Sequence, residues 1–194
     1  MARFIDELKR TSDCGALRAS DIGKEVVLFG WVARRRDHGS LVFVDLRDRG
    51  GVTQIVFDPE VSRDAHAAAD PLRSEWVIGV RGTVRSRGQQ FSQKKGEMVS
   101  ASNPNLPTGE IEVAVLEATV FNRSETPPFE LEDDSATREE VRLSHRYLDL
   151  RRGPLQDALR KRHVVSQATR SYLSSQGCME IETPFLVKYT PGGA

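Results

Sequence analysis

The chain has 194 residues, and its 28 lysine and arginine side chains balance 28 aspartate and glutamate side chains, so its net charge is zero. Hydrophobic residues make up 38% of the chain, and no apolar run approaches the roughly 20 residues that span a bilayer, which excludes a membrane-spanning protein. Charged residues make up 29%, and together with this apolar content they also exclude collagen-like and fully disordered chains.

The N-terminus and the cysteines indicate the compartment. The first ten residues, MARFIDELKR, carry charges where a secretory signal needs an apolar stretch. Cys14 and Cys178 stand far apart, without CxxC spacing or a histidine partner, so we expect neither a disulfide framework nor a metal site. Both observations favour a cytoplasmic protein.

Short runs rich in Val, Ile and Phe, bounded by Gly or Asp, predict five strands within residues 1–121. We place these strands at residues 25–35, 40–48, 52–58, 75–87 and 109–123. A short Ala-rich helix is expected over residues 62–73, and the polar residues 88–108 are expected to form a long exposed loop. This order predicts a mainly β domain, a five-stranded barrel of the oligonucleotide-binding (OB) type.

The polar, Pro-bearing residues 122–136 are typical of a linker or hinge. Residues 137–194 predict a helix through the string HRYLDLRR that stops at Gly153-Pro154, and then a long amphipathic helix to about Ser175, ended by Gly177. A strand is expected over residues 178–187, interrupted by Pro184. Because one helix and one strand cannot bury both of their faces, we expect residues 137–194 to begin a larger α+β domain.

Side chains suited to single-stranded RNA gather on the first three predicted strands. Arg34, Arg36 and Asp37 lie at the end of the first strand, and Phe43 and Gln54 lie on the next two. Arginine neutralises phosphate and stacks on bases, phenylalanine offers a π-face, and glutamine can bond a base edge. The pattern therefore predicts an RNA-binding surface.

A plainer interpretation remains open for the same residues. The arginines can form a solvated charge run beside a core phenylalanine, neutralised by Asp37, Asp45 and Asp48. Residue alternation in the second strand places Phe43 and Asp45 on one face. The sequence shows no histidine-based catalytic constellation and no phosphate-binding glycine loop, so the residues alone lead only to an RNA-binding barrel.

Three strings of this sequence, GWVARRRDHGSLVFVDLRDRGGVTQIVFD, RLSHRYLDLRR and GCMEIETPFLVKYTPGGA, together resemble the bacterial-type aspartyl-tRNA synthetases. The resemblance covers essentially the whole chain, in the order of the family. It implies an aspartate–tRNA ligase that uses ATP and Mg²⁺ in its full-length form. It also implies that residues 1–121 bind the anticodon of aspartate tRNA, with Phe43 stacked on one base and Arg36 and Gln54 in contact with its neighbours.

The resemblance further implies that the string GCMEIETPFL belongs to motif 1 of the class II synthetases, through which two subunits pair. Glu180, Glu182 and Pro184 are therefore expected at the interface of a homodimer. Many family members have TPEGA where this chain has TPGGA, so Gly192 replaces a glutamate at the edge of the substrate pocket. Losing that carboxylate removes a partner for the ammonium group of the amino acid.

His38 follows the string RRRD. A histidine at this position resembles the family members that charge asparagine tRNA as well as aspartate tRNA. The hypothesis is that His38 lies at the edge of the anticodon pocket and permits the alternative third base. The alternative is a surface histidine in a turn.

This sequence ends before the positions where the family has its motifs 2 and 3, which hold ATP and magnesium. We therefore expect residues 1–194 alone to be inactive and to hold no cofactor. One alternative is a non-catalytic RNA-binding module, against which residues 137–194 argue because such a module needs no motif 1 helix. Another is a sister amino-acid specificity.

Overall fold

A computed structural model describes residues 7–92, 97–131 and 136–186 of the chain. It divides into two compact units, Met1–Pro127 and Pro128–Ala194, with a boundary inside the predicted linker. The first unit contains strands and two short helices: η1 (Ala19–Asp21), β1 (Glu25–His38), β2 (Leu41–Arg47), β3 (Val52–Phe57), α2 (Arg63–Ala69), β4 (Val77–Ser86), β5 (Gln89–Ser92), β6 (Glu97–Ser100) and β7 (Ile111–Asn122). The second unit contains helices: α3 (Glu139–Ser144), α4 (Arg146–Asp149) and α5 (Gly153–Ser175).

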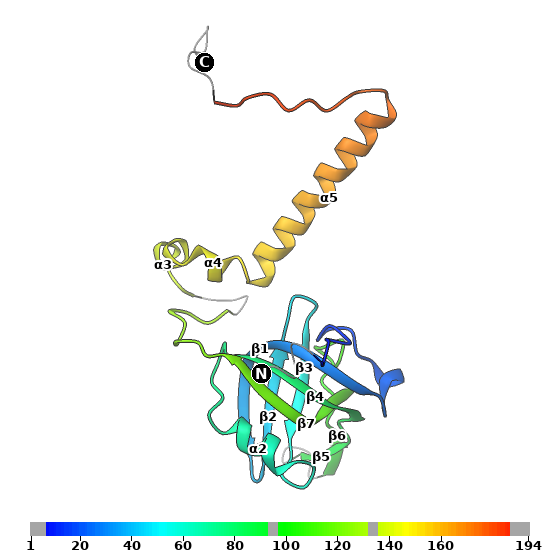
Figure 1. The fold of residues 1–194 in the computed structure, drawn as a ribbon, viewed down its shortest axis with the longest axis vertical. Coiled ribbons are helices and arrows are strands. Elements are labelled where there is room, and N and C mark those ends of the chain that lie inside the picture. The colour runs from blue at the N-terminus through cyan, green and yellow to red at the C-terminus, as the bar shows by residue number, and fades with distance from the viewer. Residues whose placement is uncertain (1–6, 93–96, 132–135, 187–194) are drawn as a thin grey trace. The chain divides into compact units, whose positions relative to one another are not determined.

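Five strands close into a barrel in the order β1-β2-β3-β7-β4 (Figure 1). The pairs are antiparallel except for β3 and β7, which run parallel and complete the ring. Gly39, with a φ of +61°, lies in the tight turn between β1 and β2. The predicted five-stranded OB-type barrel is confirmed.

Residue alternation on β2 divides the inside of the barrel from the outside. Val42, Val44 and Leu46 are buried, whereas Phe43 and Asp45 between them are partly exposed, as the sequence predicts. The interior is filled from every strand of the ring, mainly by Val26, Leu28, Val32, Val44, Leu46, Ile55, Phe57, Ile78, Val80, Val84, Ile111, Val113 and Val115. Helix α2 packs on β7, β2 and β3 through its buried Ala65 and Ala69.

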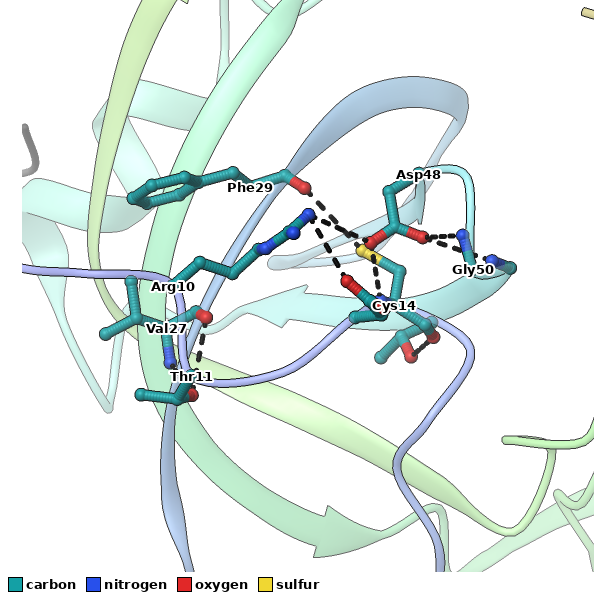
Figure 2. A network of polar contacts seen from close by, with 10 residues as sticks. Arg10, Thr11, Cys14, Val27, Phe29, Asp48 and Gly50 are labelled. Atoms are coloured by element: carbon teal, nitrogen blue, oxygen red, sulfur yellow. Dashed lines mark hydrogen bonds and ion pairs between the residues drawn. The ribbon is translucent and has the colours of Figure 1, made fainter.

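The N-terminal segment also belongs to the barrel, because Cys14 and Leu17 are buried in its core. The Asp48 carboxylate, in the β2–β3 turn, accepts hydrogen bonds from the backbone N–H groups of Cys14 (2.8 Å) and Gly50 (2.6 Å) (Figure 2). Gly15 packs so tightly on Gly50 that an added Cβ would lie 1.9 Å from the Gly50 carbonyl oxygen. The hydrogen bonds of Asp48 therefore hold the N-terminal segment against the β2–β3 turn. The sequence did not predict this contact.

Three elements differ from the expectations. The single helix expected from residue 137 through the string HRYLDLRR is divided into α3 and α4. Residues 88–108 contain a two-stranded hairpin, β5 with β6, where a loop was expected. The strand expected over residues 178–187 is wrong as far as the structure describes that segment, since residues 178–186 pair with no strand and their side chains are exposed. A strand needs a neighbour to form a backbone ladder, and this segment has none among the described residues.

A buried carboxylate joins the three helices of the second unit. Asp149 is fully buried and lies 2.7 Å from Arg146, 3.1 Å from Arg152 and 3.7 Å from Arg142. Burial alone would raise the pKa of the Asp149 carboxyl, but the hydrogen bond from Arg152 and the charges of Arg142 and Arg146 lower it below its ordinary value. The string RYLDLRR thus forms an ion-pair cluster at the start of α5.

Helix α5 begins at Gly153 with Pro154 in its first turn, where a missing N–H costs nothing. It ends at Ser175 and is followed by the predicted stop signal Gly177, whose φ is +84°. The N–H of Cys178 bonds the Leu173 carbonyl (3.0 Å) and that of Gly177 bonds the Ser174 carbonyl (3.0 Å), which forms a Schellman motif. None of its side chains is buried, and no helix in the described part of the chain could cross a membrane.

Candidate nucleic-acid interface

The register of three neighbouring strands brings the predicted RNA-binding side chains together. Across β1 and β2, Arg34 lies opposite Asp45 and Arg36 lies opposite Phe43. Across β2 and β3, Asp45 lies opposite Gln54. Residues directly opposite one another in a ladder point to the same face of the sheet. Arg34, Arg36, Phe43 and Gln54 therefore share one outer face of the barrel, which we call the Arg36 face.

Arg36 is the centre of a polar network on this face. Its Nη2 atom donates to Asp45 Oδ1 at 2.6 Å and to Gln54 Oε1 at 3.3 Å. Gln54 is buried, and its Nε2 atom donates to Glu112 Oε2 at 2.8 Å. Glu112 in turn accepts a hydrogen bond from Arg85 Nε at 2.8 Å. The network thus joins side chains from all five strands of the barrel.

Phe43 and His38 lie next to this network. Phe43 is partly exposed and is absent from the hydrophobic core, so the interpretation of a core phenylalanine is wrong. The ring of His38, at the exposed end of β1, meets Phe43 edge-on with centroids 6.0 Å apart. The pair presents an open aromatic surface beside the guanidinium group of Arg36.

The remaining arginines and aspartates are placed differently. Asp37 lies opposite Val42, on the other side of the ladder from Phe43, and its carboxylate pairs with Arg35 at 2.7 Å. Arg34 is exposed, and no ion pair or hydrogen bond of its side chain occurs within the described residues. The structure therefore brings Arg34, Arg36, Phe43 and Gln54 together but separates Asp37 from them.

Part of the plainer interpretation holds, because Asp45 does neutralise Arg36 and Asp37 does neutralise Arg35. Asp48 instead faces Arg10, at 3.8 Å. The Arg36 side chain is still 37% exposed, so its guanidinium group can meet a phosphate or a base while it stays next to Asp45.

The sequence interpretation missed three residues of the Arg36 face. Arg85 and Glu112 lie opposite one another across β4 and β7 and extend the network. Burial lowers the pKa of the nearby Arg87 guanidinium, whose Nε atom donates to the Ile111 carbonyl at 2.9 Å. The alternation of Arg81, Thr83 and Arg85 along β4 was the available signal, since it predicts an outward-facing basic side.

The arrangement can bind a polyanion with unstacked bases. It combines guanidinium groups for phosphates, an exposed aromatic ring for stacking, and a glutamine that keeps one N–H and one oxygen lone pair free of the bonds described above. Within the described residues, no three His, Cys, Asp or Glu side chains gather as a metal site would require.

Comparison with known proteins agrees with this geometry. Residues 26–121 match the OB-fold nucleic acid binding domain, and residues 138–194 match the class II tRNA synthetases for D, K and N. The aspartate–tRNA(Asp/Asn) ligase of Anaeromyxobacter dehalogenans (strain 2CP-C) is 57% identical over all 194 residues. The chain belongs to the aspartyl-tRNA synthetase family.

The aspartate–tRNA(Asp/Asn) ligase of Desulfotalea psychrophila is 50% identical over 190 residues of this synthetase chain. The chain spans about 30% of the length of both curated relatives. The aspartyl-tRNA synthetase of Entamoeba histolytica shares the fold, with a TM-score of 0.79 and 19% identity over 95% of this chain and 41% of that one. The asparaginyl-tRNA synthetase of Pyrococcus horikoshii is 26% identical, with a TM-score of 0.72 over 91% of this chain and 38% of that one.

The predicted motif 1 residues lie in the segment that follows α5. Both carboxylate oxygens of Glu180 accept from the single N–H of Arg170 Nε (3.0 and 2.9 Å), and this contact joins the segment to the helix. Glu182 and Pro184 are exposed. Gly192 lies outside the described residues.

Proposed function

We propose that the whole protein is an aspartate–tRNA ligase and that the Arg36 face of the barrel binds the anticodon of its tRNA. The observation that supports the ligase activity best is the 57% identity, over every residue of the chain, to an aspartate–tRNA(Asp/Asn) ligase. In the reaction, aspartate attacks ATP to give aspartyl-adenylate and pyrophosphate. A ribose hydroxyl at the 3′ end of the tRNA then accepts the aspartyl group.

Anticodon binding on this face follows from the chemistry of its side chains. Phe43 stacks on one unstacked base, and Arg34 and Arg36 neutralise the adjoining phosphates. Because Asp45 and Glu112 hold Arg36 and Gln54 in place before RNA arrives, little side-chain entropy is lost on binding. Asp37, on the other side of the ladder, has at most an indirect role.

The rest of the chain serves the same activity. Residues 1–121 act as the anticodon-binding domain, residues 122–136 as the hinge, and residues 137–194 as the start of the catalytic domain. ATP and Mg²⁺ are used by class II synthetases in general. Glu180, Glu182 and Pro184 form part of a homodimer interface, to which the exposed apolar side chains of α5 would also contribute.

His38 gives this synthetase access to asparagine tRNA as well as aspartate tRNA. Its ring lies against Phe43 at the rim of the proposed anticodon site, so it can contact the base next to the stacked one. Comparable charging of purified asparagine and aspartate tRNA by the full-length protein is expected. Strict preference for aspartate tRNA would contradict this assignment.

The decisive experiment measures binding of the anticodon stem-loop of aspartate tRNA across a salt series. Phe43→Ala is expected to weaken binding by about 1–3 kcal/mol, the usual contribution of one base stacked on an aromatic ring. Gln54→Ala is expected to weaken binding and to reduce the preference for the natural anticodon over substituted ones.

The matched control is Val61→Ala, which shortens another exposed apolar side chain of the same unit. It should leave the affinity unchanged. If binding ignores both the anticodon sequence and Phe43→Ala, the barrel is only a charged surface, and the non-catalytic RNA-binding module becomes the better description.

A further inference from the structure

An extra residue in β1 determines which side chains reach the Arg36 face. In the ladder with β2, Val32 lies opposite Leu46 and Arg34 lies opposite Asp45, so Ala33 is an insertion without a partner. Such a β-bulge changes which residues of a strand face outward. Before Ala33 the partly exposed residues of β1 are Phe29 and Trp31, and after it Arg34 and Arg36 face the side of Phe43.

Strand β2 shows that the change of face occurs in β1. Its own alternation continues without a break from Leu41 to Arg47. If β1 lacked the bulge, strict alternation from Trp31 would place Ala33, Arg35 and Asp37 on the outer face. Arg36 would then point toward the barrel interior. The bulge is therefore a precondition for the network of Arg36, Asp45 and Gln54.

The segment before β4 holds β1 immediately before the bulge. The backbone N–H of Glu75 donates to the Val32 carbonyl at 2.7 Å, and the N–H of Val32 donates to the Trp76 carbonyl at 2.9 Å. The Glu75 carboxylate reaches β2, where Arg47 Nη2 donates to both of its oxygens at 2.7 and 2.8 Å. Since Arg47 lies opposite Trp31, the segment before β4 contacts both β1 and β2 beside the bulge.

The backbone of Glu75 is itself unusual. Its φ of +64° is the one positive value at a non-glycine residue within the described ranges. Residues with a Cβ avoid this conformation, and they keep it where surrounding contacts compensate. The side chain of Glu75 is 7% exposed, and the double hydrogen bond from Arg47 supplies that compensation.

We propose that Glu75 is a positioning residue of the RNA-binding face, which fixes the β1 bulge at Ala33 and thereby sets Arg34 and Arg36 beside Phe43. Glu75 acts through Arg34 and Arg36 and does not touch the RNA. The effect of Glu75 on RNA affinity rests on the proposed function, but its effect on the position of Arg36 does not.

The first test needs no RNA. The side-chain amide of Gln54 senses Arg36 at its oxygen, so its NMR signals report where Arg36 lies. Glu75→Gln should shift these signals toward their positions in Arg36→Gln and should speed hydrogen exchange at the Val32 amide at least about tenfold. Unchanged Gln54 signals and unchanged Val32 exchange in a folded Glu75→Gln variant would overturn the proposal.

The second test is a double-mutant cycle on binding of the anticodon stem-loop. Glu75→Gln and Arg36→Gln should each raise the Kd about tenfold, the cost of losing a hydrogen bond to a charged group. Once both arginines are replaced, in Arg34→Gln/Arg36→Gln, adding Glu75→Gln should change the Kd by no more than about twofold, because a positioning residue has no effect once its targets are gone. Effects that multiply would overturn the proposal.

Two further variants keep the result interpretable. Glu117→Gln removes another carboxylate that pairs with a barrel arginine, Arg81 at 2.5 Å, and should leave the Kd unchanged. Arg47→Gln removes the charged donor of both hydrogen bonds to Glu75, so it should reproduce the Gln54 shift if Glu75→Gln does not fold. If the unmodified chain does not bind the stem-loop, the proposed function fails, while the NMR measurements still decide the role of Glu75.

Discussion

The barrel buries its apolar side chains in a core, whereas the helical unit leaves those of its longest helix exposed. Every strand of the barrel ring sends side chains into one shared core, and Phe57, Leu28 and Ile55 are among its fully buried members. Helix α5 buries none of its side chains, and Val164, Val165 and Tyr172 are each more than 60% exposed. The two units therefore depend on different interactions for their order.

The contrast explains why the candidate site lies on the barrel. A closed core fixes the backbone, so side chains on its outer face are presented at defined positions without help from another chain. The order of α5 depends on local features, namely the Schellman motif, the contact between Arg170 and Glu180, and the cluster around Asp149. The first three of the following four predictions compare the two units, and the fourth tests the helical unit alone.

The largest difference is expected between the two cysteine thiols. Cys14 is buried, and burial, with the nearby Asp48 carboxylate, raises the pKa of its thiol, whereas Cys178 is exposed. Cys178 should react with a thiol reagent at once and Cys14 at least about a thousandfold more slowly, since it reacts only after the barrel opens. Timed labelling of the chain and of Cys178→Ser tests this. Similar rates for both thiols would show that the barrel core is not closed.

The same truncation should have unequal effects in the two units. Leu28→Ala removes a fully buried side chain and should lower the free energy of unfolding by about 2–5 kcal/mol. Leu159→Ala, on α5, where the leucine is 47% exposed, should change it by no more than about 0.5 kcal/mol. Urea unfolding followed by tryptophan fluorescence reports the barrel, because Trp31 and Trp76 both lie there, and circular dichroism reports α5. Equal losses would contradict the comparison.

A serine-to-alanine change should have opposite signs in the two units. Ser62 caps α2, accepting a hydrogen bond from the Ala65 N–H at 3.2 Å, so Ser62→Ala should destabilise the barrel by about 1 kcal/mol. Ser171 lies within α5, shortly before its last residue Ser175, and is exposed, so Ser171→Ala should raise the helical content slightly, because alanine is the better helix former. Thermal unfolding and the ellipticity at 222 nm distinguish the two effects.

The smallest change is expected from the acid titration of Asp149. Because the pKa of its carboxyl is lower in the folded chain than its ordinary value of 3.8, its contribution is complete above that value and is lost as the pH falls through the lower, folded pKa. The difference in helical signal between the chain and Asp149→Asn should therefore be constant above pH 5 or so and shrink below about pH 4. A difference that does not change with pH would show that the charge of Asp149 is irrelevant.

The sequence was sufficient where a local pattern determines the structure. The Val- and Phe-rich runs, the face of Phe43, the break at Gly153-Pro154 before α5 and the stop signal at Gly177 were all predicted, because alternation, proline and glycine act within a few residues. The site was only partly predictable. Phe43 and Arg36 were identified because their residue types suit RNA binding. Arg85 and Glu112 were missed because they lie on strands far along the chain, and only the fold brings them to the same face.

Other features could not be derived from the pattern, for distinct physical reasons. The bulge at Ala33 does not disturb the hydrophobic alternation of the residues before it. The residues after it are charged, so they carry no hydrophobic alternation from which the change of face could be detected. The left-handed backbone at Glu75 occurs in a residue type that rarely adopts it. The strand expected after α5 failed because strand formation depends on a partner, which the local sequence does not specify.

The parallel pairing of β3 with β7 also determines when the Arg36 face can form during synthesis. Gln54 and Glu112, which bond each other across this seam, are 58 residues apart in the chain. Contacts between such distant residues require the closure of a long loop and form late. A ribosome that has completed β3 has already made Arg36, Phe43 and Gln54, but the carboxylate that orients Gln54 arrives only with β7. The nascent chain therefore carries the parts of the site before it can assemble them.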